Sequence, residues 1–348
     1  MQEVSKSVKD IQPLLTIAIP TFNRVECLKL LINSIVKQTS ENFLGRNFEL
    51  LICNNASTDG TEEYLNDLES LTGIRVVNHT QNCGAVDNVL HCFDLAKGQF
   101  VWVMGDDDVP LMGAIKAVME CIECEQPALM YLPSKWVVGD LGELAKNRIL
   151  TNKVSVTDSL TLAVRASVYV TFLSSWIVNK GLYLNQKNVK IDRYRDTFLP
   201  QLEWFFTLLA NEKKFVYAED SWVVARSGSS GGYSVLETFS HQYNRIVDDK
   251  FTDNPQLHRF FRTNMLWCFI PSLIWGMRKN AIGRFGGFDK EKTMILLKSA
   301  YQNEVFFGLV VVPMIKYNRP VAWFFRLLAA VSGKAWLFLH RKLVAGKL

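Results

Sequence analysis

The sequence predicts an α/β protein, with a doubly wound and mostly parallel sheet followed by a helical C-terminal extension, and two patterns indicate this. Over roughly the first 135 residues, short apolar runs rich in β-branched residues alternate with stretches of helical spacing. Such alternation is typical of parallel strands joined by crossover helices. After residue 304 the chain has no Asp or Glu but seven Lys or Arg among large apolar residues, which favours a helix at a membrane surface.

Five apolar runs are the expected strands: Leu14–Thr21, Phe48–Cys53, Ile74–His79, Gln99–Met104 and Ala128–Leu132. Helical spacing follows each of the first four, over Val25–Lys37, from Thr61, over Ala85–Ala96 and from Leu111. Runs of this length bounded by Gly, Pro and Asn are typical of buried strands. Strands alternating with helices of this length predict parallel pairing in a doubly wound sheet.

Length and composition limit the class of protein. The 348 residues allow one large or two modest domains. The N-terminal segment lacks the apolar core of a signal peptide, and no charge-free apolar run of about 18 residues predicts a spanning helix. Seven dispersed cysteines indicate reduced thiols. We therefore expect a cytoplasmic protein.

Polar clusters end the first four expected strands: Thr21–Arg24, Asn54–Asp59, Asn78–Gly84 and Asp106–Asp108. The carboxyl ends of parallel strands share one edge of a sheet, where ligands bind. The chain contains no GxxxxGK[ST] and no strand-linked GxGxxG, which argues against a P-loop or a dinucleotide fold. The sequence therefore predicts a different kind of ligand site at this edge.

Three consecutive carboxylates occur in the segment VWVMGDDDVP, at residues 106–108. One interpretation is a solvated acidic turn. The other is a cation site, because hard divalent ions prefer carboxylate oxygen. The three further polar clusters expected at the same edge favour the cation site.

Four segments, LLTIAIPTFNR, FELLICNNASTDGT, NCGAVDN and FVWVMGDDD, resemble the successive motifs of family 2 glycosyltransferases with the GT-A fold, which is Rossmann-like. TFLSSWIVNK and the Gly/Ser loop after VVARSG are similar to abequosyltransferase-like enzymes of bacterial O-antigen assembly. The resemblance implies an inverting transfer of a sugar from a nucleotide diphosphate sugar to a hydroxyl. It also implies an acceptor that is lipid-linked or a polysaccharide, in O-antigen or capsule synthesis.

The resemblance further implies Mg²⁺ or Mn²⁺, held by the last Asp of a DxD motif. That residue is Asp108 here, with Asp106 as a second candidate ligand. Asp106 or Asp107 then faces the ribose. The metal would neutralise the diphosphate leaving group.

The nucleotide site implied by the same resemblance comprises Pro20, Thr21, Asn23, Arg24, Asn54, Asn55, Asn82, Gly84, Asn88, Asp106, Asp107 and Arg226. Asn54 departs from the family pattern, which has an Asp there for uracil. An amide can donate and accept, so it suits uracil, thymine or cytosine, and the donor nucleotide stays open. The alternative for Asn54 and Asn55 is an Asx-stabilised turn.

Gly84 has no Cβ, so its backbone can approach a ligand closely, while Asn82 also suits a helix cap. Arg226 precedes SGSSGG, a segment suited to a lid, and its guanidinium suits a diphosphate; the alternative is a surface arginine before a linker. The family's catalytic Glu-Asp pair falls on Pro200 and Gln201, so Glu203 and Asp196 are the candidate bases.

The tail carries Arg319, Arg326, Lys334 and Arg341 on one narrow face of a predicted helix. Large apolar residues fill much of the remainder, which indicates an interfacial helix on an anionic leaflet. The alternative is a pair of helices packed on the protein's own core and broken at Gly333. Cations interspersed with large aliphatics do not favour a nucleic-acid partner.

We therefore expect an N-terminal tail over residues 1–13, a GT-A domain over 14–232 and a helical membrane-associating region over 233–348. The protein is expected to lie on the inner face of the cytoplasmic membrane. Its expected partners are a nucleotide diphosphate sugar and a lipid-linked glycan. The alternative function is a catalytically idle sugar- or lipid-binding subunit of a polysaccharide assembly complex.

Overall fold

The structure, a computed structural model, describes residues 12–39, 47–69, 74–139, 141–149, 151–227, 234–279 and 287–345. The chain divides into two compact units that exchange segments along the sequence. Unit 1 comprises Met1–Val154, Leu173–Val189 and Ala218–Arg226, and unit 2 comprises Ser155–Phe172, Lys190–Tyr217 and Ser227–Leu348. The last exchange, after residue 226, lies near the domain limit expected at residue 232; the expected limits themselves remain predictions.

Unit 1 begins with strands that alternate with helices, as the sequence predicts. Its strands are β1 (Leu15–Thr21), β2 (Phe48–Asn54), β3 (Ile74–Asn78), β4 (Phe100–Val103), β5 (Val109–Pro110), β6 (Leu129–Tyr131), β7 (Ser134–Val137), β9 (Trp176–Asn179) and β11 (Val223–Arg226). Its helices are α1 (Val25–Gln38), α2 (Thr61–Glu69), α3 (Ala85–Leu95), α4 (Ala114–Glu125), η1 (Leu144–Lys146), η3 (Leu173–Ser175) and α6 (Lys180–Leu184). Every residue of β2 and β4 is buried, which is why these runs show no alternation.

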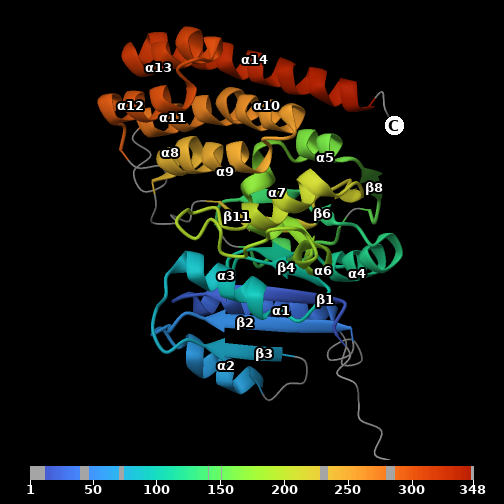
Figure 1. Cartoon of the computed structure of the whole chain (residues 1–348). Helices are drawn as coiled ribbons and strands as arrows, with labels where there is room; N and C mark the ends of the chain where they lie inside the picture. The colour runs from blue at the N-terminus through green and yellow to red at the C-terminus, as the bar shows by residue number, and fades with distance from the viewer. Residues whose placement is uncertain are drawn as a thin grey trace, which may run out of the picture. The chain divides into compact units, whose positions relative to one another are not determined.

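The strands of the main sheet in unit 1 lie in the order β3-β2-β1-β4-β9-β6 (Figure 1). β1 pairs in parallel with β2 and β4, and β2 pairs in parallel with β3. The register places Thr21 opposite Asn54, and Asn54 opposite Asn78. The polar residues that end these three strands therefore lie side by side.

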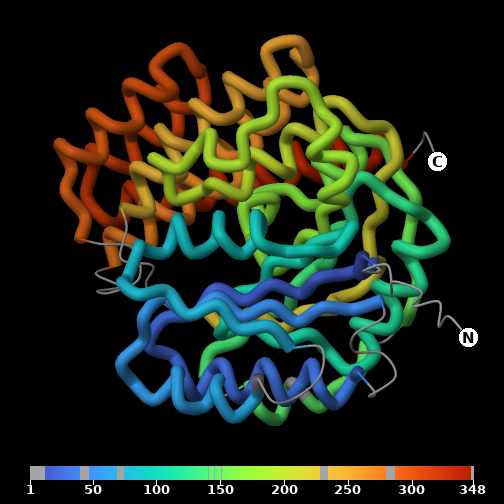
Figure 2. The backbone as a smooth tube through the Cα atoms, turned by 60° about the horizontal axis from the view of Figure 1, so that its bottom comes forward, coloured from blue at the N-terminus to red at the C-terminus, as the bar shows by residue number. Residues whose placement is uncertain are grey.

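The helices of this half cover both faces of the sheet. α1 and α2 connect neighbouring strands toward β3, whereas α3 returns across β2 and β1 to reach β4. Right-handed crossovers place the returning helix on the opposite face. Figure 2 shows α3 on one side of the strands, with α1 and α2 on the other.

The sheet is mostly parallel, as predicted, but the expected fifth strand, β6, does not pair directly with β4. β9 lies between β4 and β6 and runs antiparallel to both. It comes from a later segment of the chain that the β–α alternation does not include. Local periodicity cannot reveal a strand inserted from so far along the sequence.

A small second sheet brings a distant segment back to the Asp cluster. β11 pairs antiparallel with β5, so that Val224 lies opposite Val109, and parallel with β7. β5 begins immediately after Asp108, and β11 ends at Arg226. This pairing therefore places Arg226 beside the third aspartate.

Unit 2 is mostly helical. Its elements are β8 (Val154–Thr157), α5 (Ser159–Ala166), η2 (Ser167–Thr171), α7 (Leu202–Asn211), β10 (Phe215–Ala218), α8 (Val235–Glu237), η4 (Thr238–Gln242), α9 (Tyr243–Lys250), α10 (Pro255–Asn264), η5 (Met265–Phe269), α11 (Ile270–Arg278), α12 (Lys290–Tyr301), η6 (Phe307–Val311), α13 (Val312–Lys316) and α14 (Arg319–Ala345). β8 and β10 are neighbouring strands. An aromatic cluster of Phe206, Phe251 and Phe261 packs α7, the end of α9 and α10 together.

The C-terminal helix α14 packs against unit 2 through small residues. Ala322, Ala329 and Gly333 are buried, and a Cβ on Gly333 would come within 2.9 Å of the Trp267 carbonyl oxygen. The helix is continuous through Gly333, so the break considered at that residue does not occur. Gly333 serves instead for the close approach of α14 to η5.

The large apolar side chains of α14 are exposed. They are Val321, Trp323, Phe324, Leu327, Leu328, Val331, Phe338, Leu339 and Leu343. At 100° per residue, this apolar face lies opposite the small buried residues. α14 is also long and apolar enough to cross a membrane by length and composition, and only 17% of its most apolar window is buried, whereas a core helix would be mostly buried. A helix that buries small residues and exposes large apolar ones has the inverse of a normal surface pattern.

Candidate active site

The three aspartates follow β4 at the carboxyl edge of the sheet. Asp106 and Asp108 are buried, with 5% and 4% of their surface exposed, and Asp107 is half-buried. A solvated turn would expose its carboxylates, so burial of two of the three contradicts that interpretation. The cluster instead has the environment of a binding site.

Arg24, at the start of α1, neutralises the first two aspartates. Its Nη1 lies 2.9 Å from Asp106 Oδ1 and 3.1 Å from Asp107 Oδ2. Thr21 Oγ1 donates a hydrogen bond of 2.8 Å to Asp106 Oδ2. Burial raises the pKa of Asp106, although Arg24 and Thr21 oppose the shift. The end of β1 and the start of α1 thus hold Asp106 in place.

Asp108 has a different environment. Its Oδ2 accepts a hydrogen bond of 2.5 Å from Ser174 Oγ, and its Oδ1 accepts one of 3.1 Å from the Arg226 backbone N–H. Among the described residues, no cationic side chain forms an ion pair with it. Burial raises the pKa of Asp108 to about 7, against the hydrogen bond from Ser174.

These residues fit a divalent cation. A carboxylate offers about four acceptor positions, and the protein donors found at Asp108 use two of them. A buried carboxylate without a cation is unfavourable when ionised, and carboxylate oxygens are what Mg²⁺ and Mn²⁺ prefer. Gly105 makes the tight turn possible, since a Cβ there would lie 3.1 Å from Asp108 Oδ2.

Arg226, whose backbone N–H contacts the same carboxylate, also carries a guanidinium with a buried nitrogen. Its Nε is buried and has no hydrogen-bond partner within the described part of the chain. A buried donor without a partner costs about 1–3 kcal/mol, and an anionic oxygen would satisfy it. Arg226 is therefore a candidate partner for an anionic ligand at this edge of the sheet.

The asparagines at the strand ends form a network that joins three polar clusters. Asn54, fully buried, donates to Asn78 Oδ1 at 2.9 Å and accepts from the Ser57 N–H at 3.2 Å. Asn88, on α3, donates to the carbonyl oxygens of Cys53 and Thr21 at 3.0 and 3.4 Å. In this conformation Asn54 and Asn88 brace the edge of the sheet, and their contacts to a nucleotide remain predictions.

Asn55 connects this network to the loop before α3. Its Nδ2 donates to Asn82 Oδ1 at 2.9 Å and to the Gly84 carbonyl at 3.3 Å. Asn82 Oδ1 also accepts from the Gly84 N–H at 2.8 Å. Gly84 has a φ of 90° and no atom within 4 Å of a Cβ position. Its backbone is thus open to solvent and accessible to a ligand.

The end of β1 is tied to the loop after β2 by Asn23. Asn23 Oδ1 accepts a hydrogen bond of 2.7 Å from the Thr58 N–H, and its own N–H donates to Ser57 Oγ at 2.9 Å. Pro20 is half-buried near the end of β1. The structure brings these residues to the same edge as the aspartates, and their contacts to the nucleotide stay predictions.

The two candidate bases lie in unit 2 and both carry ion pairs. Glu203 is fully buried, 2.6 Å from Lys250 Nζ and 3.2 Å from Arg193 Nε. Asp196 accepts two hydrogen bonds of 2.7 Å from Arg245, and these lower its pKa. The hydrogen bonds from Arg245 stabilise the Asp196 carboxylate and make it a weaker base. The role of either residue as the base remains a prediction.

One expectation falls outside the described residues, and two contacts of the site have no local signal in the sequence. The predicted lid falls almost entirely on residues 228–233, outside the described residues. Ser174, which fixes Asp108, was not singled out, because nothing in FLSSW marks one serine as a partner of an aspartate 66 positions away. The pairing of Arg24 with Asp106, 82 positions away, had no local signal either.

Part of the chain matches a known protein family. Residues 16–157 match the family model described as "Glycosyl transferase family 2". This segment contains the polar clusters of the first four strands and all three aspartates.

Two characterised relatives match part of the chain. Abequosyltransferase RfbV of Salmonella typhimurium is 37% identical over 97 residues, which are 27% of this chain and 28% of that protein. A GalNAc(5)-diNAcBac-PP-undecaprenol beta-1,3-glucosyltransferase of Campylobacter jejuni is 30% identical over 111 residues, 31% of this chain and 34% of that protein. The matched segment thus spans about a third of the length of these relatives.

Solved structures resemble nearly the whole chain. Residues 1–349 of S. aureus TarS in complex with UDP-GlcNAc align with a TM-score of 0.61 and 15% identity, covering 92% of this chain and 91% of that one. The mannosyltransferase PcManGT of Pyrobaculum calidifontis, in complex with GDP-Man and Mn2+, aligns with a TM-score of 0.50 and 13% identity, covering 93% and 88%. The fold is GT-A, as the sequence predicts.

Proposed function

We propose that the protein transfers a sugar from a nucleotide diphosphate sugar to a hydroxyl acceptor, in the synthesis of a bacterial envelope glycan, because residues 16–157 match the family model "Glycosyl transferase family 2". The curated relatives that the segment matches are named for sugar transfer. The coarse activity rests on that match. The donor class, the metal and the acceptor rest on the following observations.

The proposal rests on two residues that, within the described part of the chain, lack opposite partners: Asp108 lacks a cation, and Arg226 Nε lacks a hydrogen-bond acceptor. Asp108 is a buried carboxylate without a cationic partner among the described residues, and the buried Nε of Arg226 lacks an acceptor. A divalent cation together with a diphosphate would satisfy both groups. When bound, Mg²⁺ or Mn²⁺ would be held by Asp108, with Asp106 nearby, and would neutralise the charge of the leaving diphosphate.

The protein's own residues prepare this site before any ligand binds. Ser174 and the Arg226 N–H hold the Asp108 carboxylate, and Arg24 holds Asp106. Asn82 and Gly84 form the accessible loop at the same edge. Groups fixed in this way need little reorganisation during the reaction, which is how preorganised sites lower a barrier.

A membrane-bound acceptor is the finer part of the proposal. The exposed face of α14 carries large apolar side chains, and the chain after residue 304 contains only basic charges. Such a helix is suited to the boundary between acyl chains and anionic headgroups. We infer that the acceptor is lipid-linked and that the protein lies on the inner face of the cytoplasmic membrane. There the protein would take the soluble nucleotide sugar from solution and meet the lipid-linked acceptor at the membrane surface.

A thermal-shift panel tests the donor and the metal together. The full chain is incubated with UDP, GDP, CDP or dTDP, each with and without Mn²⁺. We expect one nucleotide to raise the melting temperature only when Mn²⁺ is present, because binding to the native state alone stabilises it. If no nucleotide shifts the transition in either condition, the proposed donor site is wrong.

An idle subunit is the second candidate, favoured by the absence of a Glu-Asp pair at Pro200 and Gln201. Hydrolysis of the donor discriminates between the two. An enzyme releases nucleotide slowly in the presence of metal and absence of acceptor, whereas an idle subunit binds the donor and leaves it intact. Binding without any metal-dependent hydrolysis or transfer would support the idle subunit.

A further inference from the structure

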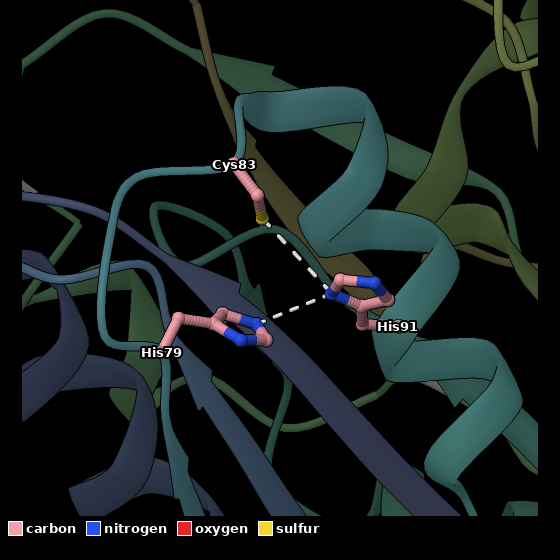
Figure 3. A group of neighbouring side chains, drawn as sticks. All are labelled: His79, Cys83 and His91. Carbon is pink, nitrogen blue, oxygen red and sulfur yellow. Dashed lines mark hydrogen bonds between the residues drawn. The ribbon is translucent and has the colours of Figure 1, made fainter.

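A second cluster of ligand atoms lies between the end of β3 and α3, apart from the aspartates. His79 follows β3, Cys83 lies on the loop, and His91 projects from α3. Their ligand atoms all lie within 4.8 Å of one another. Figure 3 shows the three side chains pointing toward one another.

The distances suit a tetrahedral ion. His79 Nε2 lies 3.4 Å from His91 Nδ1, which lies 4.0 Å from Cys83 Sγ. At zinc bond lengths of about 2.0–2.1 Å to nitrogen and about 2.3 Å to sulfur, tetrahedral ligand atoms lie about 3.3–3.6 Å apart. The two imidazoles already have this spacing. The sulfur needs to approach both imidazoles, by up to about an ångström, because the three ligand atoms lie within 4.8 Å of one another without an ion.

The neighbouring amides orient the cluster. Asn88 directs its Nδ2 to two backbone carbonyls, so its Oδ1 faces His79 Nε2 at 3.2 Å. Asn55 Oδ1 accepts from both the backbone N–H and the thiol of Cys83, at 2.9 and 3.1 Å. These contacts hold the ligand atoms in place in the metal-free protein, and the two made by His79 Nε2 and the Cys83 thiol would be exchanged for bonds to the ion.

We propose that His79, Cys83 and His91 bind one Zn²⁺ ion. Two imidazoles and a thiolate are a borderline-soft donor set that favours zinc over Mg²⁺ or Mn²⁺. On binding, the Cys83 thiol releases its proton, so the sulfur ligates as thiolate while Asn55 Oδ1 keeps the backbone N–H of Cys83. The fourth position is filled by water or by Asn88 Oδ1.

The ion would fix the loop between β3 and α3, because its ligands come from the loop's beginning, its interior and the following helix. Asn82 and Gly84 belong to this loop, and Asn55 and Asn88 contact both the cluster and the strand ends. The zinc site therefore stabilises the conformation of one side of the candidate active site. It does so without belonging to the Asp106–Asp108 site.

Cobalt titration of the metal-free full chain tests the proposal. Co²⁺ in a tetrahedral thiolate site gives a sulfur-to-cobalt charge-transfer band and intense visible absorption. We expect this spectrum to saturate at one equivalent per chain and to disappear when Zn²⁺ is added. Cys83→Ser should lose the charge-transfer band, and His91→Gln should lose the tetrahedral intensity. Cys124→Ser, which alters an exposed cysteine on α4, should retain both.

The outcome is independent of sugar transfer. Asp108→Ala should keep the cobalt spectrum, since that residue belongs to the other site. Zn²⁺ should raise the melting temperature of the wild type and not of Cys83→Ser, with circular dichroism of both metal-free proteins showing the same fold. A wild type that binds no Co²⁺ with thiolate character, or a Cys83→Ser variant with an unchanged band, would overturn the assignment.

Discussion

Asp106 and Asp108 lie in one short turn, yet the environments of their carboxylates differ. Arg24 compensates Asp106 at 2.9 Å, whereas from the described residues Asp108 receives only the hydroxyl of Ser174 and a backbone N–H. A carboxylate with hydrogen bonds but no cation is in the condition that a metal ligand requires before the metal arrives. This difference supports Asp108 as the main ligand and Asp106 as a positioned neighbour.

Replacing Asp108 tests that distinction. Asp108→Ala should weaken nucleotide binding in Mn²⁺ by at least about tenfold, since even outer partners of a metal typically cost 10–100-fold in affinity. Binding without Mn²⁺ should change little. Isothermal titration with and without Mn²⁺ measures both, and Asp107→Ala, which should have a partial effect, is the matched control. Equal Mn²⁺-dependent affinity in wild type and Asp108→Ala would contradict the assignment.

The raised pKa of Asp108 predicts how metal affinity depends on pH. With a pKa of about 7 in the metal-free protein, the carboxyl is protonated below that pH and ionised above it. Because the metal binds the ionised form and displaces the proton, Mn²⁺ affinity should fall by up to about tenfold per pH unit below 7. It should level off above pH 7. Titrations between pH 5.5 and 8.5 measure this, roughly bracketing the pKa, and a flat profile would contradict the burial of an unpaired Asp108.

The candidate bases give a third prediction at this scale. Glu203→Gln or Asp196→Asn should lower turnover by a factor on the order of 10², the usual scale for loss of a general base, while donor affinity stays unchanged. Glu203→Gln should also lower the melting temperature, because it leaves Lys250 and Arg193 without their buried partner. Initial rates per folded molecule separate the two effects. Normal turnover in both variants would show that the base lies elsewhere.

At the scale of elements, the sequence predicts what local periodicity controls. The first four strands, their helices and the polar clusters at their ends occur as expected, because buried runs and helical spacing are local patterns. The antiparallel β9, the return of β11 to β5 and the contacts of Ser174 and Arg24 with aspartates depend on long-range pairing. No short pattern encodes those. The cluster of His79, Cys83 and His91 depends on both local and long-range structure. The spacing of the three residues can be read from the sequence, but their side chains meet only because of how β3 and α3 are placed.

The packing of α14 makes a separate prediction about this helix. Gly333→Leu should destabilise unit 2, because even a Cβ would meet the Trp267 carbonyl oxygen at 2.9 Å and the helices cannot separate without loss of contact. Overpacking of this kind typically costs 1–3 kcal/mol. Val331→Leu, two residues away on the exposed face, should change stability little. Denaturant unfolding compares the two variants, and equal stability would show that α14 does not pack closely against η5.

At the scale of the whole molecule, charge is segregated along the chain. The formal charge is +5, and the seven cations after residue 304 leave 5 − 7 = −2 for everything before them. The cations flank the buried face of α14: Arg326 lies over the Trp275 ring, and Arg319 donates to the Arg278 carbonyl. The outward face is apolar. Attraction to a membrane therefore has two separable sources, headgroup charge and apolar burial.

Liposome flotation separates these sources. Changing Arg319, Arg326, Lys334 and Arg341 together to Gln should release the protein from anionic liposomes, because each cation near such a surface contributes roughly 1 kcal/mol, and should change binding to neutral liposomes much less. Changing the exposed Phe324, Val331 and Phe338 to Ser should weaken binding to both kinds, because it removes apolar burial. High salt should release the wild type partly, since it screens only the charges, whereas a spanning helix would resist extraction altogether. A wild type that floats with neither kind of liposome would show that the apolar face of α14 serves another contact.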